Sequence, residues 1–375
     1  MSGALADLRI VDFSRVLAGP LATMVLADLG AQVIKVERPG MGDETRNWGP
    51  PYDETGMATY FQAVNRNKTS VVLDLRAAGD LERARELAAG ADVVVENFRP
   101  GVMDGLGLGY ERLAADRLRA DRPELVYCSI TGFGRGEGAA LPGYDLLVQA
   151  VGGLMSITGT PQGEPQKVGV ALVDVICGLF ASTGILAALR HRDRTGAGQR
   201  VELNLLSCLL AALVNQGSAY TLAGEVAGRL GNSHPSVAPY EVLAAADGEL
   251  VVAVGTDEQF RALAQTLGCS QLADDEAFRT NAARVGNRDR LRQELEARLR
   301  ERPASDWVSA LSAAGVPAGQ VNDIAGAFTL AQRLGLDPIV EIGRAGAGVA
   351  RLTRNPIELS ATPARYHTAP PPLAR

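Results

Sequence analysis

Short apolar runs alternate with helix-like segments along the first half of the chain. Residues 9–14 form the first run, a helical pattern over 20–29 begins at a proline and ends at Gly30, and residues 31–37 form a second run. A strand, a helix and a strand in this order predict a βαβ unit, which implies parallel strands. Further strand-like runs at 70–75, 92–98 and 124–130 extend the predicted parallel sheet.

The second half of the chain has a different pattern. Residues 223–239 are rich in glycine, serine and proline, which marks a domain boundary. A hairpin around Asp247-Gly248 follows, then helical patterns at 258–267, 288–300 and 304–314. We therefore predict an α/β protein with a large Rossmann-like parallel-sheet domain over 1–222, a smaller α+β domain over 223–330, and a C-terminal segment, 331–375, that returns to the large domain.

Asp174 is the one charged residue between positions 168 and 189, a segment that is otherwise apolar or small. Burying such a carboxylate is costly unless a partner satisfies it. One interpretation makes Asp174 the N-cap that closes a strand over 168–173 and opens a helix over 175–190. The other makes it an ionised, poorly hydrated nucleophile that faces a ligand. The local sequence leaves both interpretations open.

The same segment is long enough to span a membrane. Its central aspartate and three glycines instead favour a buried core segment, and no membrane association is expected. A net charge of -6 with mixed charges throughout argues against a nucleic-acid-binding protein. Four separated cysteines and the absence of a signal-peptide pattern predict a cytoplasmic location, and three scattered histidines predict no metal site.

Each predicted parallel strand is followed by a polar or glycine-bearing loop. Ligands of open parallel sheets bind at the carboxyl ends of the strands, so Arg38, Asn97 and the loop after Ile130 are expected to line one crevice. Glu37 lies where a ribose-binding acid of a dinucleotide fold would lie. However, the loop over 16–21 has one glycine in place of three, and its proline lacks an N–H group, so NAD binding is not expected.

Several motifs, in fixed order over nearly the whole chain, resemble those of the family III (CaiB/BaiF-type) CoA-transferases. They are VDFSRVLAGP at 11–20, VIKVERPG at 33–40, GDETR at 42–46, NRNK at 65–68, VENFRPG at 95–101, GYD at 143–145, GVALVD at 169–174, RTGAGQ at 194–199 and SVAPY at 236–240. The resemblance implies that Asp174 attacks an acyl-CoA thioester and forms an aspartyl–acyl anhydride. The released CoA thiolate then forms an aspartyl-CoA thioester, from which an acceptor acid takes the CoA. Under this reading Asp174 is both nucleophile and first-turn residue of a helix.

The resemblance also implies which residues contact CoA. The motif positions correspond to Val16, Arg38, Leu73, Asn97 and Phe98, with Tyr144 close to the reaction site. An interlaced homodimer is implied as well. Arg38 is suited to a CoA phosphate because a guanidinium forms charge-assisted hydrogen bonds with phosphate oxygens.

Departures from the motifs narrow the expected activity. Related racemases carry histidine where Tyr144 stands, and a phenol is a poor proton shuttle at neutral pH, which disfavours epimerisation. Formyl-CoA transferases carry glutamine where Leu17 stands, so oxalate is not the expected acceptor. The motifs at 16–20, 47–51 and 153–159 are similar to the dicarboxylate branch, such as succinate–hydroxymethylglutarate CoA-transferases. We expect a CoA-transferase acting on succinyl-CoA or a similar donor; the alternatives are an acyl-CoA racemase or isomerase and a non-catalytic CoA-binding protein.

Overall fold

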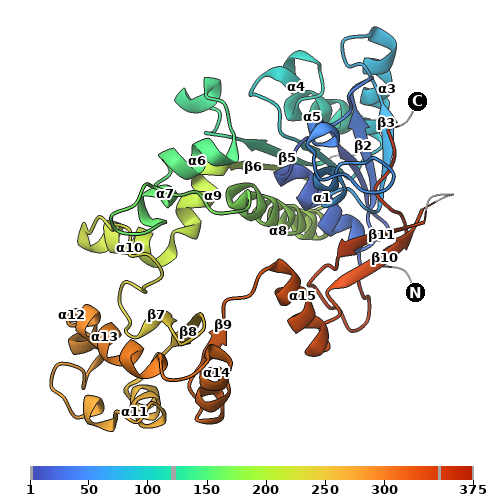
Figure 1. Cartoon of the computed structure of the whole chain (residues 1–375). Coiled ribbons are helices and arrows are strands. Elements are labelled where there is room, and N and C mark those ends of the chain that lie inside the picture. Colours follow the sequence, from blue (N-terminus) through green and yellow to red (C-terminus); the bar gives the residue numbers. More distant parts are fainter. Residues whose placement is uncertain (1–2, 120–123, 345–347, 374–375) are drawn as a thin grey trace. The chain divides into compact units, whose positions relative to one another are not determined.

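The computed structural model describes residues 3–119, 124–344 and 348–373 (Figure 1). The chain forms two compact units. The larger, which we call the sheet unit, comprises Met1–Leu154, Lys167–Val226 and Asp337–Arg375, and the small unit comprises Met155–Gln166 and Ala227–Leu336. The sequence predicted domain boundaries after residues 222 and 330. It did not predict that residues 155–166 belong to the small unit.

A six-stranded parallel sheet organises the sheet unit, as the sequence predicted. The strands lie in the order β3-β2-β1-β4-β5-β6, the order typical of Rossmann folds. Their bounds are β1 Arg9–Asp12, β2 Gln32–Glu37, β3 Lys68–Val72, β4 Val93–Glu96, β5 Val126–Thr131 and β6 Arg200–Asn204. The run that forms β6 was not assigned as a strand from the sequence.

Alternate residues of the central strands enter two separate cores. Ile10 of β1 packs in the core shared with α1 and α8, whereas Val11 packs in the core shared with α3 and α5. Val93 and Val94 of β4 divide in the same way. Side chains of a strand point alternately to opposite faces, so a strand covered on both faces is apolar at every position. This explains why these strands are recognisable as short apolar runs.

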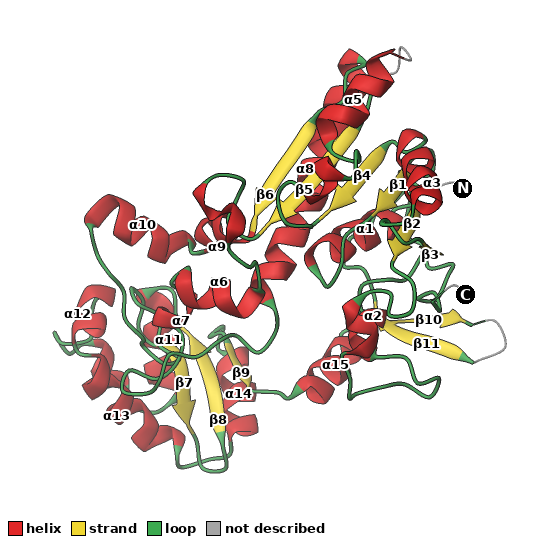
Figure 2. Cartoon of the chain, turned by 90° about the horizontal axis from the view of Figure 1, so that it is seen from above, coloured by secondary structure: helices red, strands yellow, loops and turns green. Residues whose placement is uncertain are grey.

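Helices cover both faces of the sheet, as Figures 1 and 2 show. The α1 and α8 helices pack on one face, with α9 beside them, and α3, α4 and α5 pack on the other. The helices of this unit are α1 Ala18–Asp28, α2 Thr59–Gln62, α3 Ala78–Ala89, α4 Val102–Gly105, α5 Tyr110–Arg119, α6 Asp145–Val151, α8 Leu172–Thr195, α9 Leu205–Ala212 and α10 Val214–Ala223, with 3-10 turns η1 Glu44–Asn47 and η2 Glu137–Ala140.

Most of the apolar segment around Asp174, from Leu172 to Leu189, lies in α8. The helix begins at Leu172, so the expected strand over 168–173 is wrong; the backbone there is irregular and tightens into a turn in which Leu172 N donates to Val170 O at 2.8 Å. By length and composition α8 could span a membrane, but 44% of that stretch is buried inside the unit. Cys177, Ala181 and Ile185 are fully buried, which identifies α8 as a core helix on that face.

Gly178 permits the close packing of α8 against α1. A Cβ atom at this position would lie 2.7 Å from the carbonyl oxygen of Ala18 and 3.2 Å from the Leu21 side chain. Backbone atoms give way less easily than flexible side chains, so even one methyl group forces the helices apart.

We therefore expect Gly178→Ala to lower the free energy of unfolding by about 2 kcal/mol. Urea unfolding followed by circular dichroism measures this change. The control is Gly217→Ala in α10, where the added Cβ meets only ordinary contacts at 3.5 and 3.7 Å and gains helix propensity. Equal stability of the two variants would contradict the packing argument.

The small unit has its own core around a three-stranded antiparallel sheet, β7-β8-β9. The hairpin and the three helices predicted here are confirmed. Arg284 is fully buried and donates to the carbonyl oxygens of Ala238 and Phe278 and to Asp257. The elements are α7 Leu154–Ile157, whose first residue belongs to the sheet unit, β7 Tyr240–Ala244, β8 Glu249–Ala253, α11 Asp257–Thr266, η3 Ser270–Ala273, α12 Asn281–Gly286, α13 Arg288–Leu299, α14 Ala304–Ala313, β9 Ala318–Gln320 and α15 Ile324–Arg333.

The C-terminal segment of the sheet unit forms a hairpin of β10 Ile339–Gly343 and β11 Val349–Thr353, followed by an extended tail. Asn67 ties the tail to the start of β3. Its backbone N–H donates to Thr368 O at 2.8 Å, and its side chain donates to Arg365 O at 2.7 Å. Arg66 donates to Thr353 O at 2.9 Å and pairs with the buried Asp28. These polar contacts hold the tail on the sheet unit.

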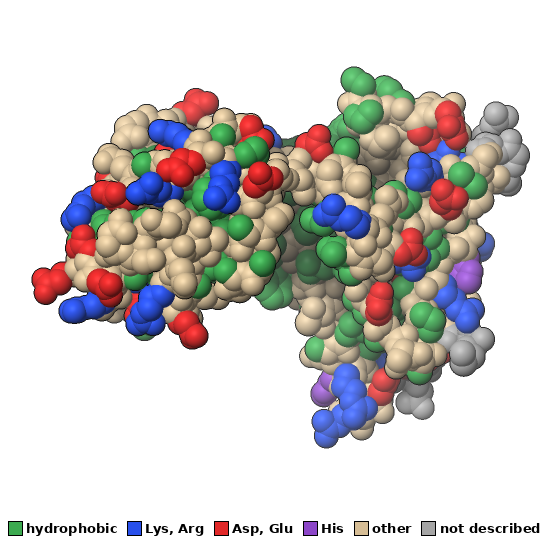
Figure 3. All heavy atoms as spheres, turned by 60° about the horizontal axis from the view of Figure 1, so that its bottom comes forward, with side chains coloured by type: hydrophobic (Ala, Val, Ile, Leu, Met, Phe, Trp, Pro, Cys, Tyr) green, Lys and Arg blue, Asp and Glu red, His purple; other side chains and the backbone are tan. Residues whose placement is uncertain are grey.

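The surface carries both signs of charge. On the face seen in Figure 3, acidic and basic side chains are interspersed over both units. This agrees with the mixed charge along the sequence.

Candidate active site

A cavity of about 220 Å³ lies where the loops after β1, β4 and β5 meet the start of α8. This is the carboxyl edge of the parallel sheet, where the sequence predicted a crevice. The cavity brings together most of the candidate residues, which come from widely separated parts of the chain. Its lining includes Val16, Asn97, Phe98, Tyr144 and Asp174, together with Arg15, Leu17, Glu44 and Trp48.

The N-terminus of α8 is capped by Asp145, a residue of another helix. Asp145 Oδ1 accepts hydrogen bonds from Val173 N at 2.8 Å and Asp174 N at 3.3 Å. Its Oδ2 accepts from Gln149 Nε2 at 2.6 Å, and Gln149 Oε1 accepts from Val168 N at 2.9 Å. The first N–H groups of a helix need such acceptors. Asp145 therefore has the capping role that one interpretation of the sequence gave to Asp174.

Asp174 is the third residue of α8, and its N-cap position is occupied by Ala171. Of the two interpretations of Asp174, the one that makes it the N-cap is therefore wrong. Among the described residues, none donates a hydrogen bond to the Asp174 carboxylate, and none pairs with it as a cation. Its oxygens remain available to a ligand in the cavity.

Burial and the neighbouring carboxylate of Asp145 raise the pKa of Asp174 to about 7. The same carboxylates affect Tyr60 of α2. Burial, and then the charges of Asp174 and Asp145, raise the pKa of Tyr60 to about 12. Its ring meets Trp48 edge-on at a centroid distance of 5.3 Å. A protonated phenol and an indole therefore lie close to a carboxylate that is ionised only near and above neutrality.

The raised pKa of Asp174 predicts a pH-dependent cost to stability. The ionised form is less favourable in the folded chain than in the unfolded one, where the pKa is near 3.8. The cost is absent below pH 4, grows as pH rises towards 7, and is complete above it. Asp174→Asn removes the cost, and we expect it to stabilise the protein by about 2 kcal/mol at pH 8 and not at all near pH 4.

Urea unfolding at both pH values measures this difference. Asp193→Asn is the matched control, because Asp193 lies in the same helix with a side chain 56% exposed. An Asp174→Asn variant that is no more stable at pH 8 than at pH 4, relative to wild type, would refute the raised pKa.

A buried charge network fixes the loop after β1. Val16 has a φ of 69°, a left-handed conformation that β-branched residues rarely adopt. Its N–H group donates to the two oxygens of Asp43 at 3.2 and 3.3 Å. Asp43 pairs with Lys35 at 2.9 Å, and both side chains are fully buried; Lys35 Nζ also donates to Ser14 O. Burial opposes the charge of Lys35, but Asp43 and Asp12 outweigh it and raise its pKa. The network holds Val16 in place at the cavity.

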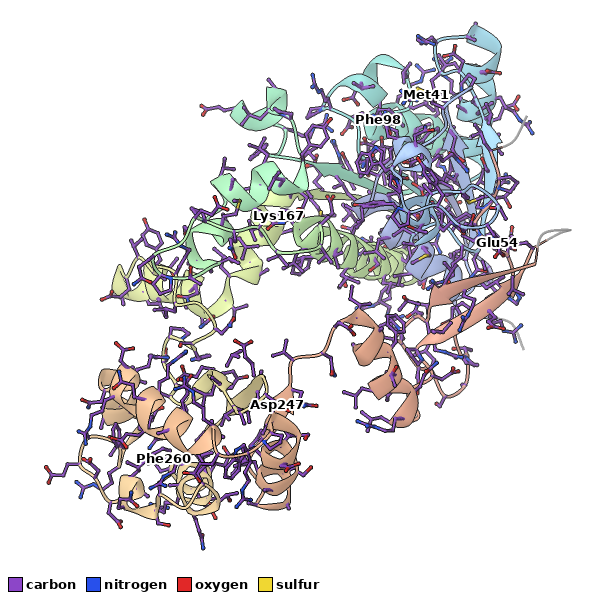
Figure 4. The ribbon with its side chains drawn as sticks, viewed as in Figure 1. Met41, Glu54, Phe98, Lys167, Asp247 and Phe260 are labelled. Atoms are coloured by element: carbon purple, nitrogen blue, oxygen red, sulfur yellow. The ribbon has the colours of Figure 1, made fainter. Side chains whose placement is uncertain are left out.

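A second cavity of about 310 Å³ lies over the ends of β2 and β3. Arg38 and Leu73, two of the predicted CoA contacts, line it. Arg15 and Phe98 line both cavities, which are therefore adjacent at these two side chains. Figure 4 labels Phe98, which follows β4. The Arg15 guanidinium lies 4.8 Å from the centre of the Phe98 ring.

Asn97 has a largely structural part in this arrangement. Its Oδ1 accepts from Arg15 N at 2.8 Å, and its Nδ2 donates to Arg15 O at 2.7 Å. The side chain thus joins the loop after β4 to the loop after β1. Tyr144, by contrast, is 65% exposed at the cavity and immediately precedes the capping Asp145.

Sequence reasoning gave no role to Arg15, Glu44, Tyr60 or Asp145. Arg15 and Glu44 stand inside recognised motifs, next to Val16 and Asp43. For Arg15, a charge directly after the predicted strand was the available signal. Asp145 follows Tyr144 in the GYD motif, but its partners are about 28 residues away along the chain. Tyr60 lies in a short helix that no sequence pattern indicated.

Comparison with known proteins identifies the family. The model of CoA-transferase family III matches residues 5–375. The chain is 43% identical to the succinate–glutarate CoA-transferase of Agrobacterium fabrum, covering 98% of this chain and 92% of that protein. It is 42% identical to the succinyl-CoA:glutarate CoA-transferase of Mus musculus, covering 92% and 78%.

A solved structure agrees with this assignment. The crystal structure of a CaiB/BaiF family protein from Brucella suis is 42% identical, with a TM-score of 0.87 and coverage of 100% of this chain and 97% of that one. The resemblance recognised in the sequence motifs is confirmed. The chain therefore belongs to CoA-transferase family III and is an enzyme that transfers CoA from an acyl-CoA to a carboxylic acid.

Proposed function

We propose that this enzyme transfers CoA from succinyl-CoA to a second dicarboxylic acid and that Asp174 is its nucleophile. The observation that supports the nucleophile is the Asp174 carboxylate, which lines the cavity without a hydrogen-bond donor or cation from the described residues. A desolvated carboxylate that ionises near neutrality is more reactive than a hydrated one. The dicarboxylate specificity is supported by the names of the two relatives described above.

The proposed reaction conserves every atom through four steps. The Asp174 carboxylate attacks the thioester carbonyl of succinyl-CoA, the C–S bond breaks, and an anhydride and CoA thiolate form. The thiolate attacks the aspartyl carbonyl, which releases succinate carrying one oxygen from Asp174 and leaves an aspartyl-CoA thioester. The acceptor carboxylate attacks this thioester and forms a second anhydride with release of the thiolate. The thiolate then attacks the acceptor carbonyl, which gives the new acyl-CoA and restores the Asp174 carboxylate.

Helix α8 assists these steps through its first turn. The partial positive charge at a helix N-terminus favours the anionic form of Asp174, while Asp145 and burial oppose it. The balance leaves a basic carboxylate that is still ionised at the pH of the cell. Exclusion of water by the bound substrates protects the anhydride from hydrolysis.

The two adjacent cavities are the proposed binding site of CoA. In this arrangement the thioester lies beside Asp174 in the first cavity, and the pantetheine chain passes Val16 and Phe98. The nucleotide then occupies the second cavity near Leu73 and Arg38. A guanidinium at the rim provides charge-assisted hydrogen bonds to phosphate.

Leu17 supports a longer acceptor than oxalate. It lines the first cavity and offers no hydrogen bond to a second carboxylate close to the reacting one. An acetyl-CoA:oxalate CoA-transferase from Acetobacter aceti is 39% identical over 96% of this chain, so overall identity alone does not select the acceptor.

The experiment offers succinyl-CoA to a panel of oxalate, malonate, glutarate, mesaconate and acetate, with mass detection of new thioesters. We expect the highest kcat/KM with a five-carbon dicarboxylate, glutarate or mesaconate. Preferred turnover of oxalate or a monocarboxylate would contradict the proposed specificity. Deuterium uptake at the acyl α-carbon without an acceptor would instead favour a racemase.

We also propose that the enzyme works as a homodimer. Helices α8, α9 and α10 expose large apolar side chains, among them Leu179, Phe180, Leu210, Val214 and Leu222, with Leu222 87% exposed. An apolar surface of this extent on one part of a protein marks an interaction site. Sedimentation of the purified enzyme tests this proposal, and a monomer at micromolar concentration would contradict it.

A further inference from the structure

Glu44 pairs with two arginines at the junction of the two cavities. Its Oε1 accepts from Arg15 Nη1 at 2.8 Å and lies 3.3 Å from Arg38 Nη2. Glu44 and Arg15 line the first cavity, while Arg15 and Arg38 line the second. One carboxylate thus pairs with two of the arginines that line the second cavity.

The arginines do not depend on Glu44 for their positions. Arg15 is held through its backbone by the two hydrogen bonds with Asn97, and its guanidinium stacks on Phe98 at 4.8 Å. Arg38 donates from Nε to Gly42 O at 3.2 Å. Removal of the Glu44 charge therefore leaves both guanidinium groups where they are.

The cluster also has unused hydrogen-bonding capacity. Arg15 Nε and Glu44 Oε2 are both buried, and neither has a partner among the described residues. A buried donor without an acceptor is costly. A ligand with several anionic oxygens would satisfy Arg15 Nε better than the single Glu44 oxygen that now contacts the group.

We propose that Glu44 is an internal competitor of the CoA phosphates for Arg15 and Arg38. This inference rests on the proposed placement of CoA across the two cavities. A carboxylate and a phosphate bind guanidinium groups through the same charge-assisted geometry. Arrival of the CoA phosphates displaces the Glu44 carboxylate from the arginines, and departure of CoA lets it return. Glu44 thereby weakens CoA binding and promotes release of the thioester product.

The test measures binding of CoA and of pantetheine, which lacks all the phosphates, by titration calorimetry to wild type and Glu44→Gln. We expect the Kd of Glu44→Gln for CoA to fall about fivefold, because the two partly exposed ion pairs of Glu44 no longer have to be broken. The Kd for pantetheine is expected to stay unchanged. Glu341→Gln is the matched control, since Glu341 pairs with Arg351 at the same 3.3 Å in the C-terminal hairpin.

Several results would contradict the proposed role of Glu44. Unchanged CoA binding by Glu44→Gln would overturn the competitor role. Weaker CoA binding would also overturn it, because Glu44 would then position the arginines. Tighter binding of pantetheine by the same factor would also overturn it, since phosphates would not be involved. A wild-type enzyme that binds neither compound would overturn the proposed placement of CoA, and this inference with it.

Discussion

Asp174→Asn is expected to lower kcat for CoA transfer by roughly 10³-fold or more, because the amide cannot form the anhydride. The affinity for the donor is expected to change little, since an amide of the same shape occupies the cavity. The variant is also expected to be more stable than wild type at pH 8, as argued above. A nucleophile that is costly to keep ionised in the fold gives this combination of gained stability and lost activity.

Steady-state kinetics and donor binding, measured on the same preparation, check this prediction. Asp193→Asn serves again as the control and is expected to keep wild-type activity. In wild type, kcat/KM is expected to fall as pH decreases through about 7, because protonation of Asp174 removes the nucleophile. An Asp174→Asn enzyme with appreciable turnover would mean that another group carries the reaction.

Asp145→Ala is expected to have the second largest effect, lowering kcat by about 10²-fold and the free energy of unfolding by about 1–2 kcal/mol. Two N–H groups of α8 and the Gln149 side chain lose their acceptor. The start of α8 is then held less firmly, and Asp174 with it. Kinetics and urea unfolding measure the two effects.

Asp145→Asn separates the charge of Asp145 from its role as a cap. Its side-chain oxygen can still accept from Val173 N, but its NH2 group then faces the Gln149 Nε2 donor. We therefore expect a smaller loss of stability than in Asp145→Ala. The loss of the charge lowers the pKa of Asp174, and the acid limb of kcat/KM moves to lower pH. If the limb does not move in Asp145→Asn, Asp145 has no electrostatic part in tuning the nucleophile.

The parallel sheet could be predicted because its signals are local. Strands buried on both faces are continuous apolar runs, and the runs at β1, β2 and β4 were recognised to within a few residues. The β6 strand was not assigned because its middle residue, Glu202, is exposed, which interrupts the apolar pattern. Glu202 pairs there with Arg200 at 2.8 Å.

The start of α8 could not be predicted, because its determinant is distant in the sequence. The composition of residues 168–173 is typical of a strand, and Asp174 is a favourable N-cap residue. The local sequence therefore predicted a strand followed by a cap. Asp145 and Gln149, from α6, instead accept the N–H groups of Val173, Asp174 and Val168. A tertiary contact of this kind leaves no trace in the local pattern.

The sequence predicted which residues form the candidate site better than it predicted how those residues interact. Val16, Asn97, Phe98, Tyr144 and Asp174 do lie around one cavity, because each follows a strand end or begins a helix at the same edge of the sheet. Asn97 was expected to contact CoA, but both ends of its amide already bind the backbone at Arg15. The pairing of Glu44 with two arginines depends on the turn after β2, whose course no periodicity describes.

Transfer of an oxygen atom tests the central claim, that Asp174 is the nucleophile, most directly. The enzyme is incubated with succinyl-CoA and an acceptor acid whose carboxylates carry a heavy oxygen isotope, and is then digested for mass spectrometry. The proposed reaction places one acceptor oxygen in the Asp174 carboxylate at each turnover, so the peptide with Asp174 gains the isotope and other peptides do not. An unlabelled Asp174 peptide after many turnovers would contradict the account.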